Sequence, residues 1–173
     1  MAFPSRPHTF ALENCRNLLD KLKREIDRLI SAADDDVDAH NDSLFNAAVT
    51  AWHLCDWVFE DMTEAHCDKF NIHSRKQMQD YARTHCRALY LCRQVATASK
   101  HWRIERHPDP NVRVITTANP IPTTSETEWP KLYIDPGCYL YFDDDGEVKA
   151  AEDVFSEAFD FWTQFIYGNE IAK

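Results

Sequence analysis

The residues best suited to chemistry lie in two short stretches of the sequence. The first contains His53, Asp56 and Glu60, which follow one another at intervals of three and four residues. Side chains at that spacing lie together on neighbouring turns of a helix. A histidine beside a carboxylate can move a proton, and the same residue types also bind divalent metals. We expect no metal and no other cofactor; if a metal were bound, its ligands would be His53, Asp56 and Glu60.

The second stretch is Ser99-Lys100-His101-Trp102. His101 would act there as a general acid or base, and Lys100 or Arg93 would hold an anionic group. Arg93 and Lys100 are seven residues apart, which places them on the same face of a helix. The predicted catalytic residues are His53, Asp56, Lys100 and His101, and the predicted ligand-binding residues are Arg93, Glu60 and Trp57.

Both stretches also have a structural interpretation. On a helical wheel, Asp56 falls among large apolar residues, namely Phe45, Val49, Trp52 and Phe59. An aspartate is almost never buried without a partner, so a donor from another helix would pair with Asp56 and fix the register of a bundle. Lys100 and His101 would be stabilised by the negative end of a helix dipole without any catalytic role. His85 lies on an apolar helix face and is expected in the core.

The composition is that of an acidic globular chain. Its 173 residues carry 19 Lys and Arg against 29 Asp and Glu, a net charge of −10. This charge repels nucleic acid at long range, although the stretch from Arg83 to Arg106 is locally basic. No apolar run approaches the roughly 18 residues that span a bilayer, and the N-terminal residues lack an apolar signal region. The six cysteines form no C-x-x-C pair, so reduced thiols and a cytoplasmic location are expected.

Hydrophobic periodicity predicts four helices, over residues 9–32, 43–66, 74–101 and 149–167. A capping box of Ser74 and Gln77 begins the third. The second is apolar around most of its circumference, which indicates a central position and favours a homodimer. Alternating residues predict strands at 102–107, 112–117, 131–134 and 139–142. The expected fold is mainly α: a single domain over residues 1–173, with a bundle of about four helices (9–101 and 149–167) and a β-hairpin insertion (102–148) before the last helix.

The acidic segment from Tyr141 to Glu152 partly matches a calcium-binding loop. Asp143, Asp145, Gly146 and Glu152 stand at the expected places. Tyr141, however, occupies the position of the first carboxylate, and a strand precedes it instead of a helix. We therefore expect a turn between strand and helix at this segment.

A resemblance adds to these patterns. The order Ala51-Trp52-His53-Leu54-Cys55-Asp56-Trp57 on one helix, followed by Ser99-Lys100-His101, resembles a group of uncharacterised bacterial and phage-associated helical proteins over residues 43–102. More loosely, a small bundle with polar residues on neighbouring helices is similar to HEPN proteins. Many HEPN proteins are metal-independent ribonucleases of toxin–antitoxin and phage-defence systems, with a motif in which four to six residues stand between an Arg and the following His. Here seven residues separate Arg93 from His101.

Three functions follow as hypotheses. The first is a small cytoplasmic helical-bundle interaction or accessory protein of a mobile element or phage-defence locus. Its partner would be another protein or a second copy of the chain, with no membrane association. The alternatives are a metal-independent HEPN-like ribonuclease, whose RNA substrate the net charge disfavours, and a metal-binding bundle hydrolase. The sequence leaves open whether the protein is an enzyme.

Overall fold

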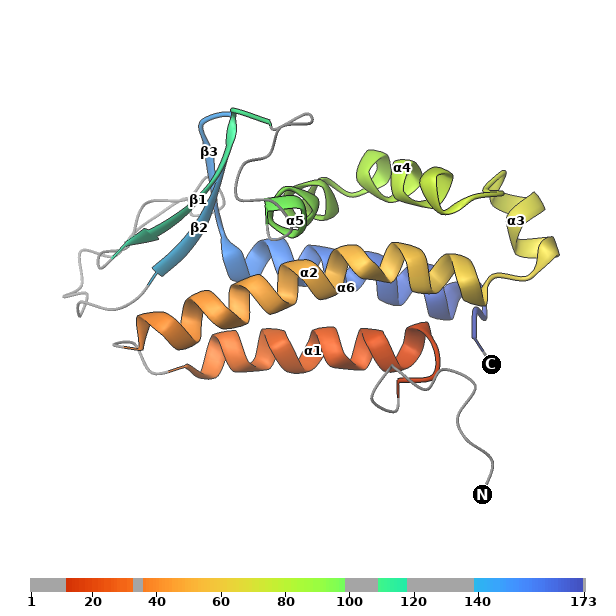
Figure 1. Cartoon of the computed structure of the whole chain (residues 1–173), viewed down its shortest axis with the longest axis horizontal. Helices are drawn as coiled ribbons and strands as arrows, with labels where there is room; N and C mark the ends of the chain where they lie inside the picture. Colours follow the sequence, from red (N-terminus) through yellow and green to blue (C-terminus); the bar gives the residue numbers. More distant parts are fainter. Residues whose placement is uncertain (1–11, 33–35, 99–108, 118–138, 173) are drawn as a thin grey trace, which may run out of the picture.

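The computed structural model describes residues 12–32, 36–98, 109–117 and 139–172. These residues form six helices and one three-stranded sheet (Figure 1). The helices are α1 (Cys15–Ser31), α2 (Val37–Asp61), α3 (Glu64–Phe70), α4 (Arg75–His85), α5 (Arg87–Ala98) and α6 (Ala151–Gly168). The strands are β1 (Val112–Thr117), β2 (Tyr139–Asp144) and β3 (Glu147–Ala150). The fold is therefore mainly helical with a small sheet before the last helix, as the sequence predicts.

Helix α2 lies at the centre of the bundle. It packs against α1, α4, α5 and α6, and Figure 1 shows α1 on one side of it and α4 and α5 on the other. Its buried apolar face repeats at helical spacing and is built mostly from small residues: Leu44, Ala47, Ala48, Ala51, Leu54, Cys55 and Val58. Small side chains allow neighbouring helices to approach closely. These four neighbours cover the buried face of α2, while Val37 and Phe45 stay exposed, and the homodimer stays a prediction.

The predicted helix over residues 43–66 is wrong at both ends. Helix α2 begins earlier, because the Asp36 side chain accepts a hydrogen bond from the Ala39 N–H and caps the helix start. It also ends earlier, and Thr63 then caps the separate helix α3. Asp36 and Asp38, which lie between the predicted helices 9–32 and 43–66, thus belong to the start of α2.

The predicted helix over residues 74–101 is divided in the structure. Ser74 caps α4 as expected, by accepting the Gln77 N–H. The backbone of Cys86 is extended, with φ −140° and ψ 110°, and ends α4. Figure 1 shows α5 nearly end-on while α4 lies across the view, so the chain changes direction at this point. With α3, this break gives six helices in the described residues instead of about four.

The sheet of the described residues contains three strands in the order β1–β2–β3. Strand β2 lies in the middle and pairs antiparallel with β1 and β3. The β2–β3 turn is Asp145-Gly146, whose positive φ values of 55° and 88° suit a two-residue hairpin. Strand β3 precedes Ala151, so the last helix starts later than predicted. The predicted strands 102–107 and 131–134 lie outside the described residues.

The core forms where α1, α2, α5 and α6 meet. Trp162 is fully buried there, and its indole Nε1–H donates to the Ala51 carbonyl at 3.0 Å. Strand β2 rests on α6 through Phe142, whose ring contacts Phe155 edge to face at 5.9 Å between centroids. Within the described part of the chain, we find no helix with the length and apolarity to cross a membrane.

Candidate functional site

The predicted carboxylates of α2 lie against α4. Asp56 is half-buried, and its Oδ1 accepts a hydrogen bond from the Gln79 side-chain amide at 3.0 Å. Glu60 is exposed and forms an ion pair with Arg75, with 2.8 Å between Oε1 and Nη2. Because Gln79 and Arg75 both belong to α4, the two carboxylates connect α2 to its neighbour.

The large apolar residues around Asp56 do not form the main contact face of α2. Phe45 is 43% exposed, and Trp52 and Phe59 are only partly buried. Side-chain size therefore misleads on this helix, because close packing against four neighbours selects alanine for the innermost positions. Asp56 stands beside the core instead of inside it, which explains how one amide donor can satisfy it.

The remaining predicted residues of α2 are His53 and Trp57, and they do not complete a metal site with these carboxylates. His53 and Trp57 are half-buried, and Trp57 packs against the core. Among the residues with described positions, no three His, Cys, Asp or Glu side chains lie close enough to hold a metal ion. The group of His53, Asp56 and Glu60 is thus not arranged as a metal site.

The second predicted stretch, residues 99–102, lies outside the described residues, whereas Arg93 lies within them. Arg93 is half-buried on α5, and its carbonyl accepts a hydrogen bond from the Thr97 hydroxyl at 2.8 Å. Lys100 and His101 lie outside the described residues. The catalytic role of these two residues stays a prediction.

The expectation that His85 lies in the core is wrong. His85 is exposed at the end of α4, and its ring stacks on Tyr81 at 4.0 Å between centroids. Its Nδ1 lies 2.8 Å from the Tyr81 carbonyl oxygen, one helical turn earlier. The break at Cys86 ends α4 here, so His85 occupies a helix end and not the middle of a buried face.

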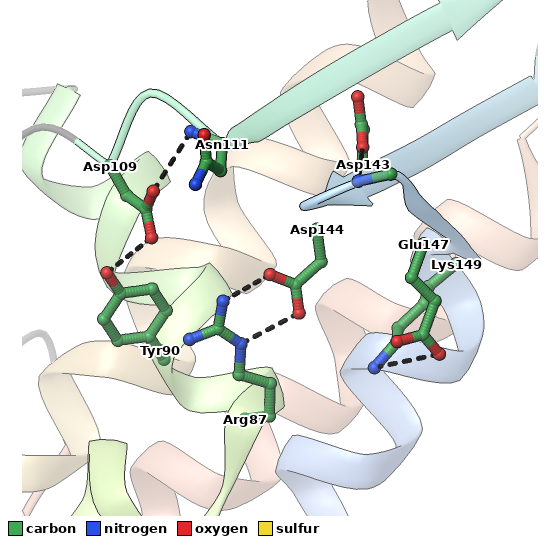
Figure 2. Close-up of polar contacts among 9 residues, drawn as sticks. Arg87, Tyr90, Asp109, Asn111, Asp143, Asp144, Glu147 and Lys149 are labelled. Atoms are coloured by element: carbon green, nitrogen blue, oxygen red, sulfur yellow. Dashed lines mark hydrogen bonds and ion pairs between the residues drawn. The ribbon is translucent and has the colours of Figure 1, made fainter.

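A polar network that sequence reasoning missed joins α5 to the sheet (Figure 2). Asp144 of β2 is buried, and both of its oxygens accept hydrogen bonds from the Arg87 guanidinium. The same guanidinium lies over the Tyr90 ring at 4.2 Å from its centroid. The Tyr90 hydroxyl donates to Asp109 at 2.8 Å, and Asp109 also accepts the Asn111 N–H at 3.0 Å. These contacts fasten one end of the sheet to α5.

The electrostatics of this network keep its acids ionised. The hydrogen bonds from Arg87 hold the pKa of Asp144 below its usual value, and the bond from Tyr90 does the same for Asp109. Burial and the bond to Asp109 raise the pKa of Tyr90. A general acid or base works best with a pKa near the working pH, and these shifts lead away from neutrality. The network is suited to holding the sheet and poorly suited to proton transfer.

One sequence signal could have located part of this network. The Asp145-Gly146 dipeptide is typical of a two-residue hairpin turn. In the structure the Gly146 N–H donates to the Asp143 side chain at 2.9 Å, inside that turn. The acidic segment therefore forms a β-hairpin, and the turn leads from strand to strand before the helix begins.

The buried cysteines are not candidates for nucleophiles. Burial raises the pKa of the Cys15 thiol to about 12 and that of Cys86 to about 11. Cys55 and Cys92 are fully buried, and burial raises their pKa values as well. A thiol is a nucleophile only as the thiolate. These residues therefore act as small hydrophobic side chains.

A polar pocket of about 610 Å³ lies between α3 and the end of α6. It is lined by Asp61, Thr63, His66, Lys69, Asn169 and Glu170 among others. Several of these groups serve the local backbone: His66 Nδ1 accepts the Thr63 N–H at 3.2 Å, and Asp61 accepts the Cys15 N–H at 2.6 Å. Lys69 donates to the Asn169 side chain at 2.7 Å. These hydrogen bonds tie helix ends together.

The resemblance to phage-associated helical proteins and to HEPN proteins depends on two motifs, and the structure describes only one of them. His53 and Asp56 lie on α2, but Lys100 and His101 are outside the described residues. The resemblance therefore stays a prediction. In comparisons with family models, curated proteins and solved structures, nothing matches this chain.

Proposed function

We propose that the chain is a helical-bundle interaction module, an accessory protein that binds a partner protein and catalyses no reaction. The observation that carries this proposal is the use of Asp56 and Glu60. Each carboxylate already has a partner on α4, Gln79 for Asp56 and Arg75 for Glu60. Carboxylates engaged in helix contacts are suited to fixing the register of a bundle.

The exposed apolar residues support the same proposal. Large apolar side chains remain open to solvent at the end of α1 and in the first half of α2: Ile30 is 61% exposed, Val37 45% and Phe45 43%. Apolar surface of this kind is typical of protein-binding sites when it is contiguous. The free cysteines of the described residues suit a reducing compartment, so a cytoplasmic module of a mobile element or phage-defence locus is the setting we propose.

A comparison of activity and binding tests this proposal. The full chain is expressed with His53→Ala, Asp56→Asn and His101→Ala as separate variants, and each is purified and incubated with labelled RNA. We expect no cleavage by the unaltered chain and no effect of its expression on growth. In parallel, cross-linking in the native cells should recover the same partner with the unaltered chain and with all three variants.

Two results would contradict the proposed interaction module. RNA cleavage that disappears in His101→Ala, while the thermal midpoint of unfolding stays unchanged, would identify a ribonuclease. Failure of the unaltered chain to cross-link to any protein would also contradict an interaction module. The thermal midpoints of the variants serve as the control for folding.

A further inference from the structure

Helices α1 and α6 enclose a groove of about 300 Å³ on the surface of the bundle. The two helices run in opposite directions and are packed against each other (Figure 1). From Lys23 to Ile30, the lining residues of α1 recur at helical spacing on one face. This stretch is about 10 Å long at 1.5 Å per residue, the length of roughly two helical turns.

The groove has an apolar floor. Ile26 and Phe159 are partly buried and pack against the core, while Ile30 is 61% exposed at the end of the groove. A branched aliphatic side chain so open to water gains free energy when a partner covers it. The floor therefore offers anchoring positions for two apolar side chains spaced along a helix.

The rim of the groove is acidic. Glu152 and Asp153 line it from the first turn of α6, and Asp27 lines it from α1. Among the described residues that line the groove, Lys23 alone is basic, and its Nζ lies 3.1 Å from Oδ1 of Asp27 in an ion pair. The described lining therefore carries three carboxylates against one ammonium group, and this excess of negative charge attracts a basic occupant.

We propose that this groove binds a two-turn segment of a basic amphipathic helix that belongs to a partner protein. The segment carries two apolar residues three or four positions apart, which cover Ile30 and Phe159. Lysine or arginine residues beside them face Glu152 and Asp153. This assignment rests on the proposed function and adds to it the docking surface and the chemistry of the partner.

A helix is the occupant that fits the shape. Two antiparallel helices present parallel ridges, and a third helix packs into the groove between them with anchors at i and i+3 or i+4. A second copy of the chain is a poorer fit, because each copy carries a net charge of −10 and the same acidic rim. Charge complementarity therefore selects a different, basic protein.

A synthetic helix tests the chemistry directly. The probe is an Ala-rich peptide of about 14 residues with two leucines four positions apart and lysines beside them. Its twin has glutamate in place of each lysine. We expect the basic peptide to bind the full chain in a fluorescence-anisotropy titration, and to bind more weakly as the salt concentration rises. Absence of binding, or equal binding of the acidic twin, would overturn the proposal.

Matched variants locate the binding. Ile30→Ser should weaken it at least about tenfold, because an apolar anchor is lost. Val114→Ser is its control, since Val114 of β1 is also exposed, at 43%. Glu152→Lys should weaken binding about tenfold. Asp42→Lys is its control, because Asp42 is exposed on α2, does not line the groove and changes the net charge equally. Equal effects of variant and control would place the peptide elsewhere and refute the groove.

The native partner separates this inference from the proposed function. If Ile30→Ser and Glu152→Lys lose the cross-linked partner while Val114→Ser and Asp42→Lys retain it, the groove is its docking site. If all four variants retain the partner, the interaction module stands and the groove assignment is wrong. Size-exclusion chromatography with light scattering completes the test, because dimerisation that Ile30→Ser abolishes would make a second copy the occupant and overturn the proposal.

Discussion

The interior of the bundle and the junction between α5 and the sheet are held together in different ways. The bundle interior is apolar, with Trp162 and Phe155 fully buried on α6. The junction depends on Arg87, whose guanidinium binds the buried carboxylate of Asp144. Strand β2 takes part in both, because residues two apart point to the same face of a sheet: Phe142 contacts α6 and Asp144 contacts α5.

Apolar burial and the ion pair contribute differently to the folded structure. Apolar burial has no preferred direction and hardly responds to pH, so it supplies most of the stability. A bidentate ion pair is directional, and its net stabilisation is reduced by the cost of removing the carboxylate from water. The pair of Arg87 and Asp144 therefore fixes how the sheet is oriented on α5, while Phe142 attaches it. The junction can be weakened while the bundle stays folded.

The largest effect is expected in the bundle interior. Trp162→Ala removes a fully buried indole and its hydrogen bond to the Ala51 carbonyl. The lost burial and the cavity should lower the free energy of unfolding by about 3–5 kcal/mol. Urea denaturation followed by circular dichroism measures this loss. Trp162→Phe, which retains most of the apolar volume, should cost clearly less; equal losses would show that the hydrogen bond and not the packing matters.

A smaller and asymmetric effect is expected at the junction. Arg87→Ala leaves the Asp144 side chain, which is only 8% exposed, without its donor and should cost about 2 kcal/mol. Asp144→Ala leaves Arg87, which is 45% exposed and can be solvated, and should cost about 1 kcal/mol. Urea denaturation gives both values, and hydrogen exchange should show faster exchange in the sheet amides than in α2.

An exposed ion pair provides the control for this asymmetry. In α4, Arg83 Nη2 lies 3.0 Å from Asp80 Oδ1, and the side chains of Arg83 and Asp80 are 42% and 45% exposed. Arg83→Ala should therefore change the free energy of unfolding by less than about 0.5 kcal/mol. If Arg87→Ala costs no more than Arg83→Ala, or if Asp144→Ala costs more than Arg87→Ala, the burial of Asp144 is not what makes the junction sensitive.

The same comparison explains what could be predicted from the sequence. The helices and the position of the sheet follow from local periodicity, and the capping residue Ser74 marks the start of α4 correctly. The break at Cys86 has no local signal, because neither glycine nor proline stands there and the residues on both sides have helical periodicity. Arg87 and Asp144 are 57 positions apart, so only the folded chain reveals their contact.

The candidate site shows the same limit. The spacing of Asp56 and Glu60 correctly indicates one helix and a need for partners, yet it cannot say whether those partners are substrates or neighbouring side chains. In the structure the partners are the neighbouring side chains of Gln79 and Arg75. Helix α4 packs against α2 and brings both donors to the carboxylates. Neighbouring turns of one helix are predictable, whereas the residues of a second helix are not.

The smallest effect is expected when the pH is lowered. Acid should weaken the junction between α5 and the sheet while the bundle interior stays packed. Arg87 lowers the pKa of Asp144 below its ordinary value of 3.8. The stabilisation from this pair is therefore complete above pH 4 or so and is lost as the pH falls through the lowered pKa. Relative to the intrinsic exchange rate at the same pH, sheet amides should lose protection as this acid range is entered, and the measurement is hydrogen exchange by mass spectrometry.

One bundle residue responds to acid in the same direction and must be separated from this effect. Burial of Glu25 would raise its pKa, but hydrogen bonds from Lys21 and Arg28 outweigh burial and lower it. The double variant Asp144→Asn with Asp109→Asn removes both titrating carboxylates of the junction and leaves Glu25 unchanged. The sheet of this variant should lose its own acid response and follow the bundle. A sheet that still loosens before the bundle in this double variant would mean that Phe142, and not the carboxylates of the junction, limits its attachment.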